Sequence, residues 1–428
     1  MRSFLLVLLA SIGGLVLWTA LVVFGTLQGW FRQPLAPAEN VRAFMDAAVD
    51  EIDANRRGNV AFVLIENGQI YDEYFASVGE PVDGDTLFQV ASLGKWITAF
   101  GVMALVEEGK LDLDVPVSRY LTRWQLPDSQ FDNNGVTVRR LLSHTAGLTD
   151  GLGYAGFRPG TEVQTLEDSL TRAADASPGA DGRVRVGHAP GSEWQYSGGG
   201  YTLLQLLIEE VTDESFEAYM QRTVFKPLGM SRSTFQIDVN NASNLAVLYD
   251  LDGTPAIHNR FTSLAATSLY TTTSDLTRFI QAHLPGPAGE PVGRGVVTAE
   301  TLKQMRQPHA SQMGFDIWGL GTILYAPNGA GFVIGHDGNN EPAINTTARL
   351  NPETGDGIVI LETGNELLAT TLAGEWVFWQ TGKLDLLMVT LVANRTMTMI
   401  VAGWLVIVLA GLLIGWRLRR AGKVPRGD

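Results

Sequence analysis

Two long apolar runs, one near each end of the chain, most constrain what this sequence can fold into. Residues 3–31 contain no charged side chain, and neither do residues 396–416. A helix that crosses the apolar interior of a bilayer needs about twenty apolar residues, so either run is long enough. We therefore expect a membrane helix at each end, with residues 1–34 as an N-terminal anchor and residues 396–416 as a C-terminal transmembrane helix.

The charges that follow the second run predict its orientation. The tail "RLRRAGKVPRGD", residues 417–428, carries five basic side chains. Because basic residues stay on the cytoplasmic side, the tail is expected to be cytoplasmic and the intervening domain to lie outside the cytoplasmic membrane, on the periplasmic or outer side. A cleaved signal peptide is the alternative for the first run, since "APA" at 36–38 resembles a cleavage site. The length of the run favours an uncleaved anchor. Residues 384–395 are expected to form an interfacial helix or the early part of the span.

Charge and composition exclude several classes of partner. The formal charge is −14; removing Arg2 (+1) and the tail (+5 and −1) leaves about −19 on the exported part. A nucleic-acid partner is therefore not expected, since phosphate binding needs a basic face. The chain has no cysteine, which excludes disulfides and thiolate chemistry. Its six histidines show no metal-binding spacing, so neither a metal nor another cofactor is expected.

The region between the apolar runs reads as one large domain, residues 38–383, with an α+β fold. A helix is predicted at 38–55, followed by a β-hairpin around Asn67-Gly68. Strand patterns then give way to helical stretches and loops, and return near the C-terminus. The late strands are predicted at 318–327, 331–338, 344–352 and 357–364, before a closing helix at 366–380. We expect the first and last parts to form one antiparallel sheet with flanking helices, and the middle to form a helical lobe.

Ser92 and Lys95 stand one turn apart at the start of an apolar helical pattern that Gly109 ends. A serine at a helix N-terminus lies near free backbone N–H groups that can stabilise an oxyanion. A lysine one turn later can take the serine proton if its pKa is depressed. The alternative is a capping serine beside a solvated lysine.

Two further segments could carry chemistry. Tyr196 stands in a glycine-rich loop ahead of an amphipathic helix, and it either packs or relays a proton near a cation. His336 ends an apolar strand run and is either a surface histidine or a hydrogen-bonding group in a site. Gly338 follows, and a strand glycine often marks the close approach of another backbone or a ligand.

Together these segments resemble a known family. In this order, Ser92-Leu93-Gly94-Lys95, Tyr196-Ser197-Gly198 and His336-Asp337-Gly338 resemble the three active-site motifs of the penicillin-recognising serine hydrolases. The stretches 141–148, 190–197, 225–235 and 268–280 are similar to the class C β-lactamase-like branch, which includes D-alanyl-D-alanine carboxypeptidases, D-aminopeptidases and esterases. The resemblance covers residues 60–365 and implies a β-lactamase/transpeptidase-like fold.

The resemblance also implies roles for these residues. Ser92 would be the nucleophile that forms an acyl-enzyme, Lys95 the amine that activates it, and Tyr196 the general base and acid. His336 would replace the family's strand lysine, which orients the tyrosine and faces a substrate carboxylate. The backbone N–H groups of Ser92 and of Asn339, which follows Gly338, would form the oxyanion hole.

The sequence departs from the family pattern at two places. Gly198 stands where many relatives have an asparagine that contacts the substrate, which argues against an efficient β-lactamase. Glu341 follows the third motif and would disfavour an anionic substrate if it faces the pocket. Ser143 and His144 match a recurrent family stretch, and we interpret them as structural.

The leading hypothesis is a membrane-anchored serine hydrolase that acts on D-amino-acid peptides of the peptidoglycan type or on esters. The alternatives are a true β-lactamase, a catalytically weak binding or sensory protein, and a membrane structural protein. The expected partners are a small-molecule or peptide substrate and the lipid bilayer. The sequence identifies no protein partner.

Overall fold

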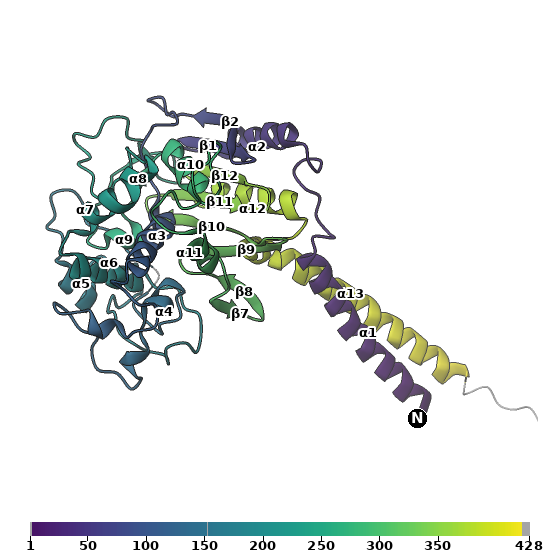
Figure 1. Ribbon diagram of the computed structural model, residues 1–428. Coiled ribbons are helices and arrows are strands. Elements are labelled where there is room, and N and C mark those ends of the chain that lie inside the picture. The colour runs from purple at the N-terminus through teal and green to yellow at the C-terminus, as the bar shows by residue number, and fades with distance from the viewer. Residues whose placement is uncertain (1, 152, 422–428) are drawn as a thin grey trace, which may run out of the picture.

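The computed structural model describes residues 2–151 and 153–421, so the end of the predicted basic tail, residues 422–428, lies outside the described residues. The chain forms a globular part from which two long helices project side by side (Figure 1). The first is α1 (Arg2–Leu27) and the second is α13 (Leu386–Ala421).

An eight-stranded antiparallel sheet organises the globular part, in the order β2-β1-β12-β11-β10-β9-β8-β7. Its strands are β1 (Val60–Glu66), β2 (Gln69–Ala76), β7 (Ala310–Gln312), β8 (Phe315–Trp318), β9 (Ile323–Asn328), β10 (Gly331–Asn340), β11 (Ile344–Asn351) and β12 (Asp356–Thr363). Strand β1 pairs with β12, which joins the two ends of the domain as predicted. The predicted hairpin is also confirmed, since Asn67 and Gly68 connect β1 to β2 with φ of 51° and 75°.

Helices cover both faces of the sheet. Helices α2 (Val41–Asn55) and α12 (Leu368–Thr381) pack on one face, and α3 (Gly94–Glu107) and α10 (Thr273–Ala282) on the other. Strand β1 is buried along nearly its whole length because alternate side chains enter the two cores: Phe62 packs beneath α2 and α12, and Val63 joins the opposite core. The predicted closing helix, α12, is confirmed, and it covers this face of the sheet together with α2.

The middle of the chain forms the predicted helical lobe. Its helices are α4 (Val138–Leu142), α5 (Leu166–Arg172), α6 (Gly198–Thr212), α7 (Phe216–Met220), α8 (Lys226–Leu228), α9 (Leu264–Thr267) and α11 (Ala299–Met305). The expected absence of strands from this region is wrong in detail, because two small two-stranded sheets occur in it. They pair β3 (Phe88–Gln89) with β6 (Tyr270–Thr271), and β4 (Leu248–Tyr249) with β5 (Pro255–Ala256). Strands of two residues are too short to show a period in the sequence.

Helices α1 and α13 run antiparallel along each other (Figure 1). The indole N–H of Trp18 donates to the carbonyl of Met399 (3.1 Å), and that of Trp404 donates to the hydroxyl of Thr19 (2.9 Å). Segments Leu5–Leu27 and Val392–Arg420 are long and apolar enough to cross a bilayer, by length and composition. Residues 386–395 belong to α13, and the candidate span begins within them, at Val392.

Candidate active site

Ser92 is held on a tight turn that leads into α3. A 3₁₀ turn (Ala91–Leu93) precedes the helix, and Ala91 has a φ of 48°. This left-handed conformation costs an L-residue about 1–2 kcal/mol, so the surrounding packing must enforce it. Ala91 is fully buried, whereas Ser92 is partly exposed. The turn therefore presents the hydroxyl at the start of a helix.

Lys95 is buried beside Ser92 and is not a solvated lysine. Its Nζ lies 3.0 Å from Ser92 Oγ and 2.5 Å from the carbonyl oxygen of Ala266, and its side chain is buried. Burial lowers the pKa of Lys95 to about 7, against the opposing charge of Asp150. A large share of Lys95 is therefore neutral at neutral pH and can accept the proton of Ser92.

Tyr196 stands over this pair. Lys95 Nζ lies 5.1 Å from the centroid of its ring. Burial raises the pKa of its hydroxyl, and the interaction with the nearby Ser92 hydroxyl opposes that rise. Tyr196 is therefore a neutral phenol at neutral pH.

His144 supports Tyr196 from behind. The two ring centroids are 4.3 Å apart, and His144 Nδ1 accepts a hydrogen bond from the N–H of Ser197 (3.1 Å). Burial lowers the pKa of His144 well below its usual value, with Lys95 adding to the effect. The neutral ring packs against the tyrosine and fixes the next residue, which fits the structural interpretation of His144.

Asp150 is a buried carboxylate that the sequence reasoning missed. Its oxygens accept hydrogen bonds from the hydroxyl of Ser197 and from the N–H of Gly199 (2.7 Å) at the start of α6. Burial raises the pKa of Asp150 to about 6. A Cβ on Gly199 would lie 2.7 Å from the carboxyl carbon, so only glycine lets Asp150 approach the helix. The nearest signal in the sequence is its place two residues after the stretch 141–148.

His336 lies on β10 and is buried and neutral. Its Nδ1 donates to the carbonyl of Asp337 (2.6 Å), and its ring meets Trp318 edge to face at 5.4 Å. Its Nε2 has no hydrogen-bond partner among the residues that the structure describes. Burial, together with Lys95, lowers its pKa to about 4. His336 thus lacks the positive charge of the strand lysine whose place it was expected to take.

Gly338 meets the expectation of a close approach. A Cβ on it would lie 2.1 Å from the carbonyl oxygen of Val90, two residues before Ser92. Strand β10 also runs through this motif to Asn340 and does not end at it, contrary to the predicted end of the strand.

The structure brings these predicted residues together in one cleft of about 600 Å³. Ser92, Lys95 and Tyr196 line it, as do residues 336–340 of β10 and Glu341 after them. Glu366 also lines the cleft, beside Asn339, whose Nδ2 donates to its carbonyl (2.8 Å). Gly198 does not line it; this residue is buried at the first position of α6. Among the described residues no group of three His, Cys, Asp or Glu side chains could hold a metal ion.

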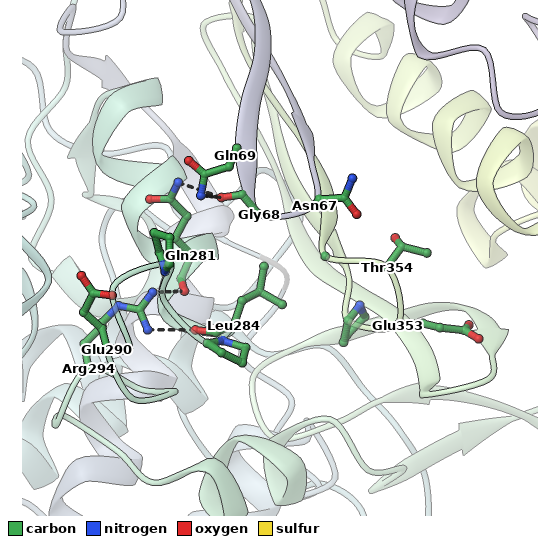
Figure 2. A pocket seen from close by; sticks show the side chains of 13 residues that line it. Asn67, Gly68, Gln69, Gln281, Leu284, Glu290, Arg294, Glu353 and Thr354 are labelled. Atoms are coloured by element: carbon green, nitrogen blue, oxygen red, sulfur yellow. Dashed lines mark hydrogen bonds between the residues drawn. The ribbon is translucent and has the colours of Figure 1, made fainter.

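A second hollow of similar size lies far from these residues. Figure 2 shows it between the β1–β2 turn, the loop after α10 and the β11–β12 turn, with a volume of about 620 Å³. The residues that line it include no serine, lysine, tyrosine or histidine. Arg294 donates to the carbonyls of Gln281 and Leu284 and is not free for a ligand. The first cleft is therefore the candidate active site.

A helix-flanked antiparallel sheet, with a Ser-x-x-Lys helix, a tyrosine loop and a β-strand motif meeting in one cleft, defines the β-lactamase-fold class of serine hydrolases. A comparison with family models agrees. The chain belongs to the Beta-lactamase family, whose model matches residues 38–375.

Curated relatives carry different names. The chain is 26% identical over 325 residues to Protein flp of Staphylococcus aureus (strain MRSA252), a match that covers 70% of this chain and 58% of the relative. It is 32% identical over 209 residues to Esterase EstB of Burkholderia gladioli, covering 45% of this chain and 51% of the esterase. The chain thus spans little more than half the length of these relatives.

Solved structures show the same fold. An octameric penicillin-binding protein homologue from Pyrococcus abyssi superposes with a TM-score of 0.64 at 24% identity, covering 81% of this chain and 79% of its own. A β-lactamase/D-alanine carboxypeptidase from Pseudomonas syringae has a TM-score of 0.62 at 18% identity, covering 78% and 97%. The predicted β-lactamase/transpeptidase-like fold is confirmed.

Proposed function

We propose that this protein is a membrane-anchored serine hydrolase that works through an acyl-enzyme on Ser92. The observation that carries the proposal is the pair of Ser92 and Lys95, in which a buried amine with a pKa near 7 lies 3.0 Å from a partly exposed hydroxyl. A pure binding protein has no physical need for a lysine held in this state.

Acylation would begin with neutral Lys95. Its Nζ takes the proton of Ser92 as Oγ bonds to the substrate carbonyl carbon, and the N–H groups of Ser92 and Asn339 stabilise the oxyanion. Tyr196, a neutral phenol, passes its proton to the leaving group, and the proton on Lys95 restores it. Water then attacks the acyl-enzyme with the same groups as its base.

The charges that line the cleft favour esters, or amides without a carboxylate beside the scissile bond. Among the described lining residues Lys95 is the one cation, and it is committed to Ser92 and Ala266. Glu341 and Glu366 are exposed at the rim, and His336 is neutral. An anionic substrate such as a penicillin would find no positive partner, which disfavours the β-lactamase alternative. We therefore propose esters as substrates ahead of peptides that end in a free D-alanine.

The membrane part of the proposal is supported by the two apolar helices and the basic residues after the second. These features favour a domain outside the cytoplasmic membrane with a cytoplasmic C-terminus.

Intact-mass spectrometry of the full chain in detergent tests the function. Wild type and Ser92→Ala are exposed to a p-nitrophenyl ester, an activated phosphonate and a penicillin. We expect a phosphonate adduct on wild type and none on the variant, with the ester turned over faster than the penicillin. Adducts of equal yield on both proteins would remove Ser92 as the nucleophile, and no adduct with any probe would favour the binding or sensory alternative.

A further inference from the structure

One buried guanidinium links the active-site strand to the start of the C-terminal helix. Arg349, on β11, is fully buried. Its Nη2 lies 2.8 Å from Asp337 Oδ2, and its Nη1 lies 2.5 Å from Asp385 Oδ2. The guanidinium also stacks over the ring of Tyr325 at 3.8 Å. A guanidinium in such a place needs both partners, since removing one leaves part of a buried charge uncompensated.

The first partner belongs to the wall of the cleft. Asp337 stands between His336 and Gly338, and strand alternation directs its side chain away from that of His336. Besides Arg349, it accepts hydrogen bonds from Tyr325 Oη (3.0 Å) and Thr347 Oγ1 (2.5 Å). The position of Asp337 therefore fixes the segment that carries His336, Gly338 and the N–H of Asn339.

The second partner starts α13. Asp385 Oδ1 accepts the N–H of Met388 (2.7 Å), as a helix cap does, while its Oδ2 binds Arg349. Asp385 is completely buried, and four residues (382–385) separate α12 from α13. The carboxylate of Asp385 thus caps the start of α13 and also ends the row of ion pairs Asp337–Arg349–Asp385 that leads from the cleft.

We propose that Asp385 is a positioning residue, which through Arg349 and Asp337 holds the β10 wall of the cleft in place against Ser92. The expected effect on kcat rests on the proposed hydrolase function. Through these contacts, the start of α13 supports the active site. A domain cut at Lys383 keeps Arg349 and Asp337 but loses the group that holds them.

Asp385→Asn in the full chain tests this. Asparagine keeps the size and the capping oxygen but removes the charge. We expect kcat for a p-nitrophenyl ester to fall by about tenfold or more, with KM within about twofold, because the oxyanion hole acts in the transition state. The double variant Asp337→Asn/Asp385→Asn should lose no more activity than Asp337→Asn alone, since Asp385 acts through Arg349 and Asp337.

Glu375→Gln is the matched control. Glu375, on α12, forms an ion pair with Arg32 that also lies at the junction with the apolar helices but does not reach β10. We expect wild-type kcat for this variant. A kcat for Asp385→Asn equal to that of the control would overturn the proposal.

Hydrogen exchange separates this proposal from the proposed function. Amides of residues 335–340 should exchange faster in Asp385→Asn than in wild type or Glu375→Gln, whether or not the protein turns over any substrate. Unchanged exchange at these amides overturns the positioning role. An inactive wild type with faster exchange in Asp385→Asn overturns only the hydrolase function.

Discussion

At the scale of single residues, the chemistry of the cleft depends on the pKa of Lys95, on which burial and one nearby charge have opposite effects. Burial lowers the pKa of Lys95, and the carboxylate of Asp150 opposes the effect. Ser197 and Gly199 hold that carboxylate by hydrogen bonds. The start of α6 therefore fixes the negative charge that acts on Lys95, and it also fixes the backbone next to Tyr196.

A pH profile tests this balance. Lys95 must be neutral to take a proton, so kcat/KM for an ester is expected to rise as pH increases through about 7 and then level off. Asp150→Asn removes the charge that raises the pKa of Lys95, and the rising limb should move to lower pH by about half a unit or more.

Asp175→Asn is the control for this shift. Asp175 is a buried carboxylate of the same lobe, but it is not among the groups that perturb Lys95. Its replacement should leave the limb in place. A limb that moves to higher pH in Asp150→Asn would contradict the assignment of Lys95 as the base.

At the scale of the elements, the sequence predicts the longer strands of the sheet because they carry period and turn signals. It misses β7 and most of β8, and the strand predicted at 318–327 is interrupted at 319–322, between β8 and β9. The contacts that the cleft residues make with distant parts of the chain could not be predicted in this way. His144 and Asp150 reach Tyr196 and Ser197 only because residues 141–150 pack against the start of α6, about fifty residues later in the chain. Likewise the neutrality of His336 follows from burial against Trp318 and Lys95, which no local pattern contains.

Strand β12 carries another buried acid, Glu362, and its effect on stability can be measured. Burial raises the pKa of Glu362 to about 8, and its carboxyl group accepts a hydrogen bond from the N–H of Ala369 at the start of α12. The native state therefore holds a proton that the unfolded chain releases at about pH 4.5, and stability falls as pH rises from there through 8.

Glu362→Gln removes this dependence because glutamine stays neutral. The Tm of the variant is expected to match that of wild type near pH 5 and to exceed it by about 3 °C or more at pH 8. Glu366→Gln, at an exposed position four residues later, should leave the Tm unchanged at both values. A lower Tm for Glu362→Gln at pH 8 would mean that the carboxylate is ionised and stabilising there.

At the scale of the whole molecule, the two apolar helices form an antiparallel pair, so the start of α1 and the end of α13 lie at the same end of that pair (Figure 1). If both helices cross the bilayer, tags before α1 and after α13 must be on the same side, opposite the globular part.

Protease treatment of spheroplasts checks this topology. The domain at 38–383 should be digested from outside, while both tags stay protected until the cells are lysed. Digestion of one tag with protection of the other would exclude a pair of spanning helices, and protection of the domain would reverse the orientation.

The short connection between α12 and α13 also limits where the cleft can go. Four residues join these helices, and one of them, Asp385, forms a buried ion pair with Arg349. If α13 crosses a bilayer, this connection leaves the domain almost no flexible tether, and the height of the cleft above the lipid would then be fixed. Such an enzyme would search a thin layer in two dimensions, and a substrate held at the same height would meet it far more often than one dissolved in the bulk.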